Sequence, residues 1–192
     1  MYSLYIDTHS NNINICLFKD GSLLKHVTSE SVQQHSVVVL PTIRALLSEF
    51  SITVDNLEEI LVINGPGSFT GVRIGVTIAK TLSFCLNIPI KLLDSLFIKA
   101  VCIDLDEKYV SLVDKHGAFV GVFDKDNKKV SEYKYISKSE YESECVLHDY
   151  ISEVDIDYNK VYDASKSIEV TPSHAANPLY IKDIEALNGK KN

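Results

Sequence analysis

The sequence has few cysteines, and those it has lie far apart. They are Cys16, Cys85, Cys102 and Cys145, and no two of them form a CxxC pair. A disulfide framework or a structural zinc site needs cysteines at close, repeated spacings. We therefore expect free structural thiols in a reducing compartment and no metal site built from them.

Positive charge is also scarce. The chain carries 19 lysines and arginines against 26 aspartates and glutamates, which gives a formal net charge of -7. A protein that binds nucleic acid by itself neutralises phosphates with Lys and Arg side chains. The basic pair Lys190-Lys191 is typical of a solvated tail. The composition therefore disfavours a chain that binds nucleic acid alone.

Long apolar runs are absent as well. No stretch reaches the roughly 18 residues that a membrane-spanning helix needs. Residues 1–8 lead directly into a strand, without a basic region or a cleavage site. The sequence therefore predicts a cytoplasmic protein with no membrane partner. Its 45% hydrophobic content is ordinary for one or two globular domains.

What the sequence does have is a glycine-rich segment at 65–75, GPGSFTGVRIG. It follows a short apolar strand, 59–64, and opens a helix that runs to about residue 86. Two glycines flank a proline, which is typical of a sharp turn, and a hydroxyl of Ser68 or Thr70 can cap the helix. A strand, a glycine turn and a helix N-terminus can together bind an anion. The candidate anion-binding residues are Gly65, Gly67, Ser68, Thr70 and Arg73.

This helix carries small residues every four positions, at Gly71, Gly75 and Ala79. Apolar residues cover its other faces, and a helix that is apolar all round is buried. The bare stripe would let a second backbone approach closely, as small residues do in helix pairs. The segment therefore has two candidate uses, anion binding and the docking of a partner helix.

The elements of the first half follow in the order β-β-β-α-β-α-β. The predicted strands are 2–8, 13–19, 22–29, 59–64 and 89–93, and the predicted helices are 32–50 and 69–86. Helix 32–50 has one apolar face at helical spacing and a second apolar strip. That strip consists of Val37, Val38, Pro41 and Ala45. It is a surplus beyond what one sheet face can cover.

The pattern restarts in the second half, after a short helix expected at 95–101. The predicted elements are strands 109–113, 119–123 and 130–136, a helix 137–151 and a short strand 161–162. The repeated β-β-β-α-β order indicates a duplicated architecture with two domains, 1–100 and 101–192. The second domain lacks a long final helix and is therefore expected to be reduced.

No constellation of residues predicts catalysis. His35 has no second histidine within one turn, whereas zinc needs three or four ligands. Ser68, His35 and Asp7 share no recognised triad spacing. Nucleotide-binding proteins of this duplicated topology use an Asp at the end of the first strand with a nearby glycine, but the next glycine after Asp7 is Gly21. We therefore predict that Asp7 has a structural role and that the chain has no catalytic and no metal-binding residue.

Several segments match the pattern of one family. They are 65–75, His35-Ser36 with Leu40-Pro41, Asp7-Thr8, Asp94-Ser95-Leu96 and, more weakly, 113–117 and 178–182. In these segments the chain resembles the TsaB (YeaZ) family, bacterial relatives of the Gcp/TsaD proteins. The resemblance covers about the first 100 residues well.

The resemblance implies an α/β fold of the actin, Hsp70 and hexokinase type, with duplicated RNase H-like β-β-β-α-β-α domains. It implies a non-catalytic subunit that pairs with a TsaD-like catalytic subunit and works with a TsaE-like ATPase. That complex transfers threonylcarbamoyl to the adenosine beside the tRNA anticodon, so this chain would meet tRNA only through the complex. ATP and metal are expected on the partner subunits, no cofactor on this chain, and a homodimer when it is alone. The superfamily's older label is peptidase M22-like.

The expected partner interface lies on the two long helices. Its residues are His35, Val37, Val38, Pro41, Ala45, Gly71, Gly75 and Ala79. Two alternatives remain open. An independent ATP-dependent phosphotransferase or ATPase of the same fold would need an intact phosphate turn in both halves. A metalloprotease would need metal ligands, and His35 has no histidine at position 31 or 39.

Overall fold

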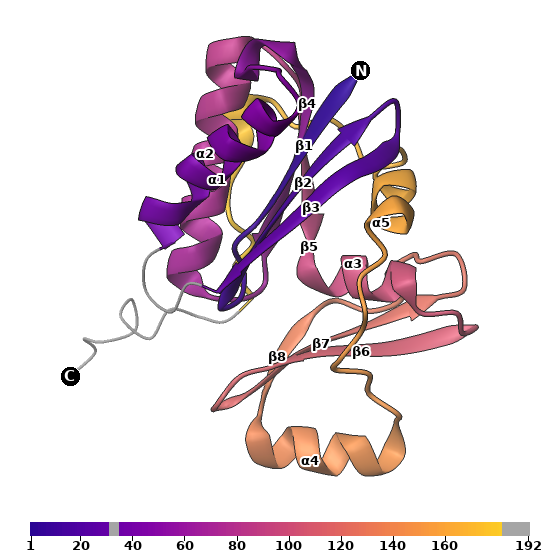
Figure 1. Ribbon diagram of the computed structural model, residues 1–192. Coiled ribbons are helices and arrows are strands. Elements are labelled where there is room, and N and C mark those ends of the chain that lie inside the picture. The colour runs from indigo at the N-terminus through magenta and orange to yellow at the C-terminus, as the bar shows by residue number, and fades with distance from the viewer. Residues whose placement is uncertain (31–34, 182–192) are drawn as a thin grey trace, which may run out of the picture.

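The computed structural model describes residues 1–30 and 35–181, apart from the side chain of His35. It contains a five-stranded and a three-stranded sheet, each with helices packed on it (Figure 1). The first sheet belongs to the first half of the chain and the second sheet to the second half. The duplicated α/β architecture predicted from the sequence is confirmed.

The first sheet has the strand order β3-β2-β1-β4-β5. The strands are β1 (Tyr2–Asp7), β2 (Asn12–Lys19), β3 (Ser22–Glu30), β4 (Leu57–Gly65) and β5 (Ile90–Asp94). β1, β2 and β3 pair antiparallel, whereas β4 pairs parallel with β1 and with β5. The β2–β3 hairpin turns at Asp20 and Gly21, both at positive φ, as the Asp-Gly pair favours.

Helices cover both faces of the first sheet (Figure 1). One face carries α1 (His35–Glu49) and α2 (Phe69–Leu86), and the other carries α3 (Ser95–Cys102) and α5 (Tyr158–Ser165). The alternation of the strands explains this arrangement, since successive side chains point to opposite faces. Leu4 and Ile6 pack under α1 and α2, whereas Tyr5 between them packs under α5. Two short 3-10 turns, Val54–Asn56 and Ser173–Ala175, lie beside the elements of the first sheet.

Helix α2 matches its predicted bounds and is long and apolar enough, by length and composition alone, to cross a membrane. In the structure it lies against β4 and β1 of the first sheet. Its buried residues include Val72, Val76 and Ala79, which belong to the core under that sheet face. The position of α2 is that of a core-covering helix. Residues 32–34, the start of the other predicted long helix, lie outside the described residues.

The second sheet is smaller and antiparallel, with the order β6-β7-β8. Its elements are β6 (Glu107–Val113), β7 (Gly117–Asp124), β8 (Lys134–Ser137) and helix α4 (Lys138–Leu147). Ser137 and Glu140 form the predicted capping box of α4. α4 ends before the predicted residue 151, because the ring of His148 stacks on Tyr109 at 4.3 Å and the chain becomes extended. Ile151 then forms a single parallel bridge with Val110 of β6. At the corresponding place in the first sheet a whole strand, β4, pairs parallel with β1.

The predicted strand 161–162 is wrong, because these residues lie in helix α5. Asp157 caps this helix by accepting hydrogen bonds from Asn159 N and Lys160 N. Two consecutive β-favouring residues, Val161 and Tyr162, suggested a strand, but both are buried on one side of α5. The structure thus places part of the predicted second domain, 101–192, on the first sheet.

Asp94 connects the two halves of the chain. It caps α3 by accepting a 2.6 Å hydrogen bond from Phe97 N, and it accepts a second, 2.9 Å bond from Tyr133 Oη of the second half. Burial raises the pKa of Asp94 to about 6, above the ordinary 3.8, although the hydrogen bonds oppose this shift. The carboxyl group is therefore neutral in the folded chain at pH values where it is ionised in the unfolded chain.

We expect this shift to make the stability pH-dependent. A raised folded-state pKa means that the contribution is full below about pH 4 and is lost as the pH rises through about 6. The loss is about 3 kcal/mol, since one pKa unit corresponds to about 1.4 kcal/mol. In Asp94→Asn, which keeps a capping oxygen but cannot ionise, this loss should disappear. Denaturant unfolding of the wild type and Asp94→Asn at pH 4 and pH 7 measures the free energy of unfolding of each protein. If the two proteins differ in this free energy by the same amount at both pH values, the assignment to Asp94 is contradicted.

Candidate functional site

The glycine-rich segment joins β4 to α2 and forms the turn predicted for it. Ser68 is the N-cap, and its Oγ accepts a hydrogen bond from Gly71 N at 3.2 Å. Thr70, the alternative cap, lies in the first turn of α2 with an exposed side chain. The helix start is therefore set locally, by a hydroxyl three residues before the amide that it binds.

The turn closes on the chain's own backbone. Ser68 N donates a 2.7 Å hydrogen bond to the carbonyl oxygen of His9. A Cβ at Gly67 would overlap that carbonyl oxygen, and a Cβ at Gly65 would lie 2.9 Å from the carbonyl oxygen of Leu179. Both glycines also have positive φ. The Ser68 amide is thus already bonded, and neighbouring backbone fills the space beside Gly65 and Gly67. Anion binding by this turn stays a prediction, which the closed geometry disfavours.

Arg73, the cation of the predicted anion site, is held by aromatic side chains. Its Nε donates a 2.7 Å hydrogen bond to Tyr180 Oη. Its guanidinium carbon lies 3.8 Å from the ring centroid of Phe69. Arg73 is the fifth residue of α2, and the Phe69 ring one turn earlier makes a cation–π contact with it. Arg73 thus holds Tyr180 against the first turns of α2.

The stripe of small residues on α2 is used inside the chain. Thr8 lies across it, and its Oγ1 donates a 2.7 Å hydrogen bond to Gly71 O. A Cβ at Gly71 would overlap the carbonyl oxygen of Thr8, and a Cβ at Gly75 would overlap Thr8 Oγ1. Ala79 is fully buried in the core of the first sheet. The prediction of close backbone approach is confirmed, but the predicted docking of a partner on Gly71, Gly75 and Ala79 is wrong, because the end of β1 occupies the stripe.

The second predicted strip, on α1, lies mainly at the surface. Val37 is 66% exposed, and Pro41 and Ala45 are exposed one and two turns further along. Val38 instead packs partly against the core of the first sheet. His35 stays a prediction, because its side chain lies outside the described part of the chain. Leu40, which is 51% exposed, is a further apolar residue on this surface and was not part of the predicted strip.

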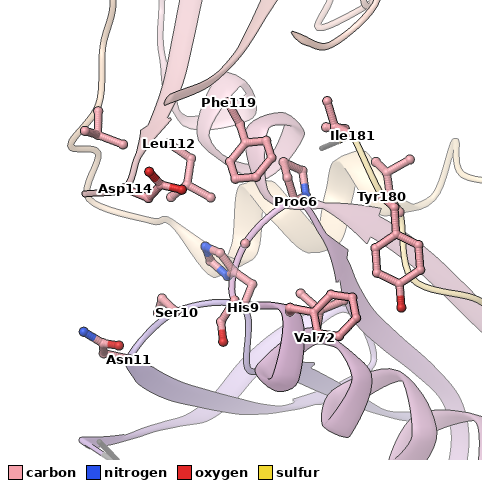
Figure 2. A pocket seen from close by; sticks show the side chains of 15 residues that line it. His9, Ser10, Asn11, Pro66, Val72, Leu112, Asp114, Phe119, Tyr180 and Ile181 are labelled. Atoms are coloured by element: carbon pink, nitrogen blue, oxygen red, sulfur yellow. The ribbon is translucent and has the colours of Figure 1, made fainter. Parts of the chain in front are cut away.

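A cavity of about 620 Å³ lies between the two halves of the chain (Figure 2). The first half contributes the β1–β2 turn with His9 and the start of α2 with Pro66. The second half contributes the β6–β7 hairpin with Leu112 and Phe119, and the segment that ends at Ile181 closes a further side. No local pattern could have revealed this cavity, since four segments distant in sequence line it.

His9 and Asp7 form a buried pair at the edge of this cavity. His9 Nδ1 lies 2.6 Å from Asp7 Oδ1, and the backbone N–H of His9 donates to the same oxygen at 3.0 Å. Tyr5 Oη donates a longer bond, 3.4 Å, to Asp7 Oδ2. Asp7 therefore orders the turn after β1, as predicted. His9 could not be recognised as part of a site from the sequence, because a histidine two residues after an aspartate forms no recognised motif.

Among residues 1–30 and 35–181, no group of three or more His, Cys, Asp or Glu side chains is arranged to hold a metal ion. Lys80, a second cation of α2, donates hydrogen bonds to the carbonyl oxygens of His174 and Ala176. The described cations of α2 thus hold the C-terminal segment in place.

Comparisons with known proteins connect this structure to one family. A family model described as TsaD, tRNA N6-adenosine threonylcarbamoyltransferase, matches residues 23–131. The tRNA threonylcarbamoyladenosine biosynthesis protein TsaB of Bacillus subtilis is 40% identical over 96 residues, which are 50% of this chain and 42% of that relative. TsaB of Escherichia coli is 32% identical over 89 residues, 46% of this chain and 38% of the relative. The chain thus spans about four-tenths of the length of these curated relatives.

A solved structure has nearly the same extent as this chain. It is described as an uncharacterized protein with similarity to peptidase YEAZ from Pseudomonas aeruginosa. It superposes with a TM-score of 0.78 at 16% identity and covers 94% of this chain and 99% of that chain. At this identity the likeness shows the fold alone. Together the comparisons confirm the expected resemblance to TsaB (YeaZ) and the expected fold.

Proposed function

Because the chain belongs to the TsaD family, and because it resembles the TsaB relatives in particular, we propose that it is a scaffold subunit in tRNA threonylcarbamoyladenosine synthesis. It binds and supports a TsaD-like catalytic subunit, works beside a TsaE-like ATPase and meets tRNA only through that complex. ATP and metal belong to the partner subunits, and the chain carries no cofactor of its own. It acts in the cytoplasm and pairs with itself when alone.

The observation that carries this proposal is the outer face of α1. We call the α1 face the exposed surface made by Val37, Leu40, Pro41 and Ala45. The opposite side of the same helix is fully used, since Val39, Ile43, Leu46 and Leu47 are buried under the first sheet. Adjacent exposed apolar residues on a helix of a globular chain are typical of a protein interface. The α1 face lies on the same side of the sheet as α2 (Figure 1).

The closed glycine turn supports a scaffold over an independent ATPase. A phosphate group needs free backbone N–H groups at the start of a helix. Here Ser68 N already donates a hydrogen bond to the carbonyl oxygen of His9. The same carbonyl oxygen fills the space beside Gly67 that a bound phosphate would need. The geometry therefore favours the subunit role over the phosphotransferase alternative.

The proposal predicts that Ala45→Glu on the α1 face weakens binding to the organism's TsaD-like protein. A buried unpaired charge at the centre of an interface is expected to weaken the affinity about 100-fold, or roughly 3 kcal/mol. The melting temperature should barely change, because Ala45 is exposed. Co-purification and calorimetric titration measure the effect, and the same variant should also weaken self-association.

A matched control places the same charge elsewhere. Val146 of α4 is 83% exposed and lies on the second half, so Val146→Glu should leave binding unchanged. Equal binding by Ala45→Glu and the wild type would exclude the α1 face as the interface. Hydrolysis of ATP by the purified wild type at about 1 per second or faster, the usual range for enzymes, would contradict the scaffold role itself.

A further inference from the structure

We propose that the cavity between the two halves binds an uncharged heteroaromatic ring through a ring N–H that donates to His9 Nε2. This site goes beyond the proposed scaffold function and does not depend on it. It rests on three features of the described residues: a buried histidine with one nitrogen available, apolar walls of suitable size, and the sign of the surrounding charge.

The histidine is positioned to accept a hydrogen bond from a ligand. Its side chain is only 9% exposed, and Nδ1 lies 2.6 Å from Asp7 Oδ1. Because a carboxylate oxygen can only accept, the contact with Asp7 requires the hydrogen on Nδ1, and the tautomer with that hydrogen has its lone pair on Nε2. Among the described residues Nε2 has no hydrogen-bond partner. Figure 2 shows the ring directed into the cavity between Pro66 and Leu112.

The backbone around His9 is also fixed. Its N–H donates to Asp7, and its carbonyl oxygen accepts from Ser68 N. Hydrogen bonds to Asp7 and Ser68 therefore fix the backbone of His9, and a third contact, with Asp7, fixes its ring. A pre-ordered acceptor binds a ligand without a further loss of side-chain freedom.

The walls suit a flat apolar ring. Pro66, Val72, Leu112, Phe119 and Ile181 all line the cavity, and their side chains carry no charge and no hydrogen-bonding group. The volume of about 620 Å³ lies within the range of small-molecule sites. Phe119 offers an aromatic face, and aromatic rings associate with a further ring by stacked or edge-to-face contact. A flat ring would pack on these apolar side chains with its donor directed at His9 Nε2, while the polar lining residues Ser10, Asn11 and Asp114 lie on other sides of the cavity.

The charge of the described lining residues disfavours anions. Asp7 lies behind His9, and Asp114 lines the opposite side (Figure 2). Asp114 Oδ1 accepts hydrogen bonds from His116 N and Tyr135 Oη, which hold the carboxylate in the wall. None of the described lining residues is Lys or Arg. Among the described lining residues a phosphate or carboxylate would approach Asp114 and meet no Lys or Arg, which favours an uncharged ligand.

Benzimidazole is a suitable probe, because it is flat, uncharged near pH 8 and has one ring N–H. We expect it to bind the full chain with a dissociation constant of roughly 1 mM, the scale for a ligand of its size. 1-Methylbenzimidazole has no N–H and should bind about tenfold more weakly. Benzimidazole-5-carboxylate should also bind about tenfold more weakly, because of its charge. Calorimetric titration and amide chemical-shift changes measure all three.

Variants at His9 test the acceptor itself. His9→Phe keeps a ring but removes Nε2, so it should reduce benzimidazole binding about tenfold and abolish the difference between the two uncharged probes. His9→Gln keeps an acceptor and should retain that difference. His116→Gln is the matched control, since His116 is exposed and does not line the cavity. Melting temperatures establish that each variant is folded.

Three results would overturn the site. They are no binding of benzimidazole at roughly ten times the expected dissociation constant, equal binding of the methylated probe to the wild type, and tighter binding of the carboxylate. The comparison of the methylated and unmethylated probes needs only the wild-type protein, so it remains decisive even if His9→Phe does not fold.

Discussion

Replacing Gly71 by alanine is expected to lower the free energy of unfolding by about 3 kcal/mol or more. The added Cβ would overlap the backbone carbonyl oxygen of Thr8, and buried overpacking against backbone is among the most destabilising changes in a core. At an ordinary position in a helix, the same change stabilises by about 1 kcal/mol. The sign of the effect in denaturant unfolding therefore distinguishes a close contact from an open helix face.

Gly75 provides a control with a different outcome. Its added Cβ would meet the Thr8 hydroxyl rather than the backbone, so Thr8→Ala should relieve much of the cost of Gly75→Ala and none of the cost of Gly71→Ala. Thr8→Ala alone should cost about 1 kcal/mol, the value of its hydrogen bond to Gly71 O. A double-mutant cycle measures this coupling. Absence of coupling between positions 8 and 75 would contradict the packing described for α2.

Tyr162→Ala is expected to lower the free energy of unfolding by about 4 kcal/mol, the range for a buried aromatic side chain. The Tyr162 ring is 2% exposed, and its centroid lies 4.7 Å from that of Phe18 in β2. Its loss should release α5 from the first sheet, so limited proteolysis should cut near α5 before the chain unfolds. Denaturant unfolding and the mapped cleavage sites measure both effects.

The conservative variant separates the ring from its hydroxyl. Tyr162 Oη and Ser3 Oγ lie 3.3 Å apart in the buried layer, so Tyr162→Phe should cost only about 1 kcal/mol. An equal loss of stability in Tyr162→Phe and Tyr162→Ala would mean that the hydroxyl, and not the packing of the ring, holds α5 in place.

Local chemistry was sufficient to predict the start of α2 and the order of the strands and helices along the first half of the chain. The Ser68 hydroxyl binds an amide three residues away, and the strand alternation is visible within short windows. The small-residue stripe correctly predicted a close approach. Its neighbour could not be predicted, because Thr8 and Gly71 are 63 residues apart and the stripe has the same appearance whether its neighbour lies inside or outside the chain.

The errors share this cause. α5 is a short helix of 8 residues whose Val161-Tyr162 pair favours a strand, and only its contact with the first sheet explains its conformation. The residues of the predicted anion site do form a turn, but the carbonyl oxygens of His9 and Leu179 that close it come from other segments. The cavity beside His9 is made by parts of four segments, so no single stretch of the sequence carries a pattern that predicts it.

The return of α5 to the first sheet also orders events on the ribosome. Ser3 and Tyr162 touch across 159 residues of chain, which takes roughly 8 to 30 s to synthesise at the usual rate of translation. During that interval β1 and β2 can pair with β3 and receive α1, but the sheet face that carries Tyr5 and Phe18 has no α5 to cover it. The nascent chain therefore exposes an aromatic surface until α5, at Tyr158–Ser165, has emerged and can pack on it.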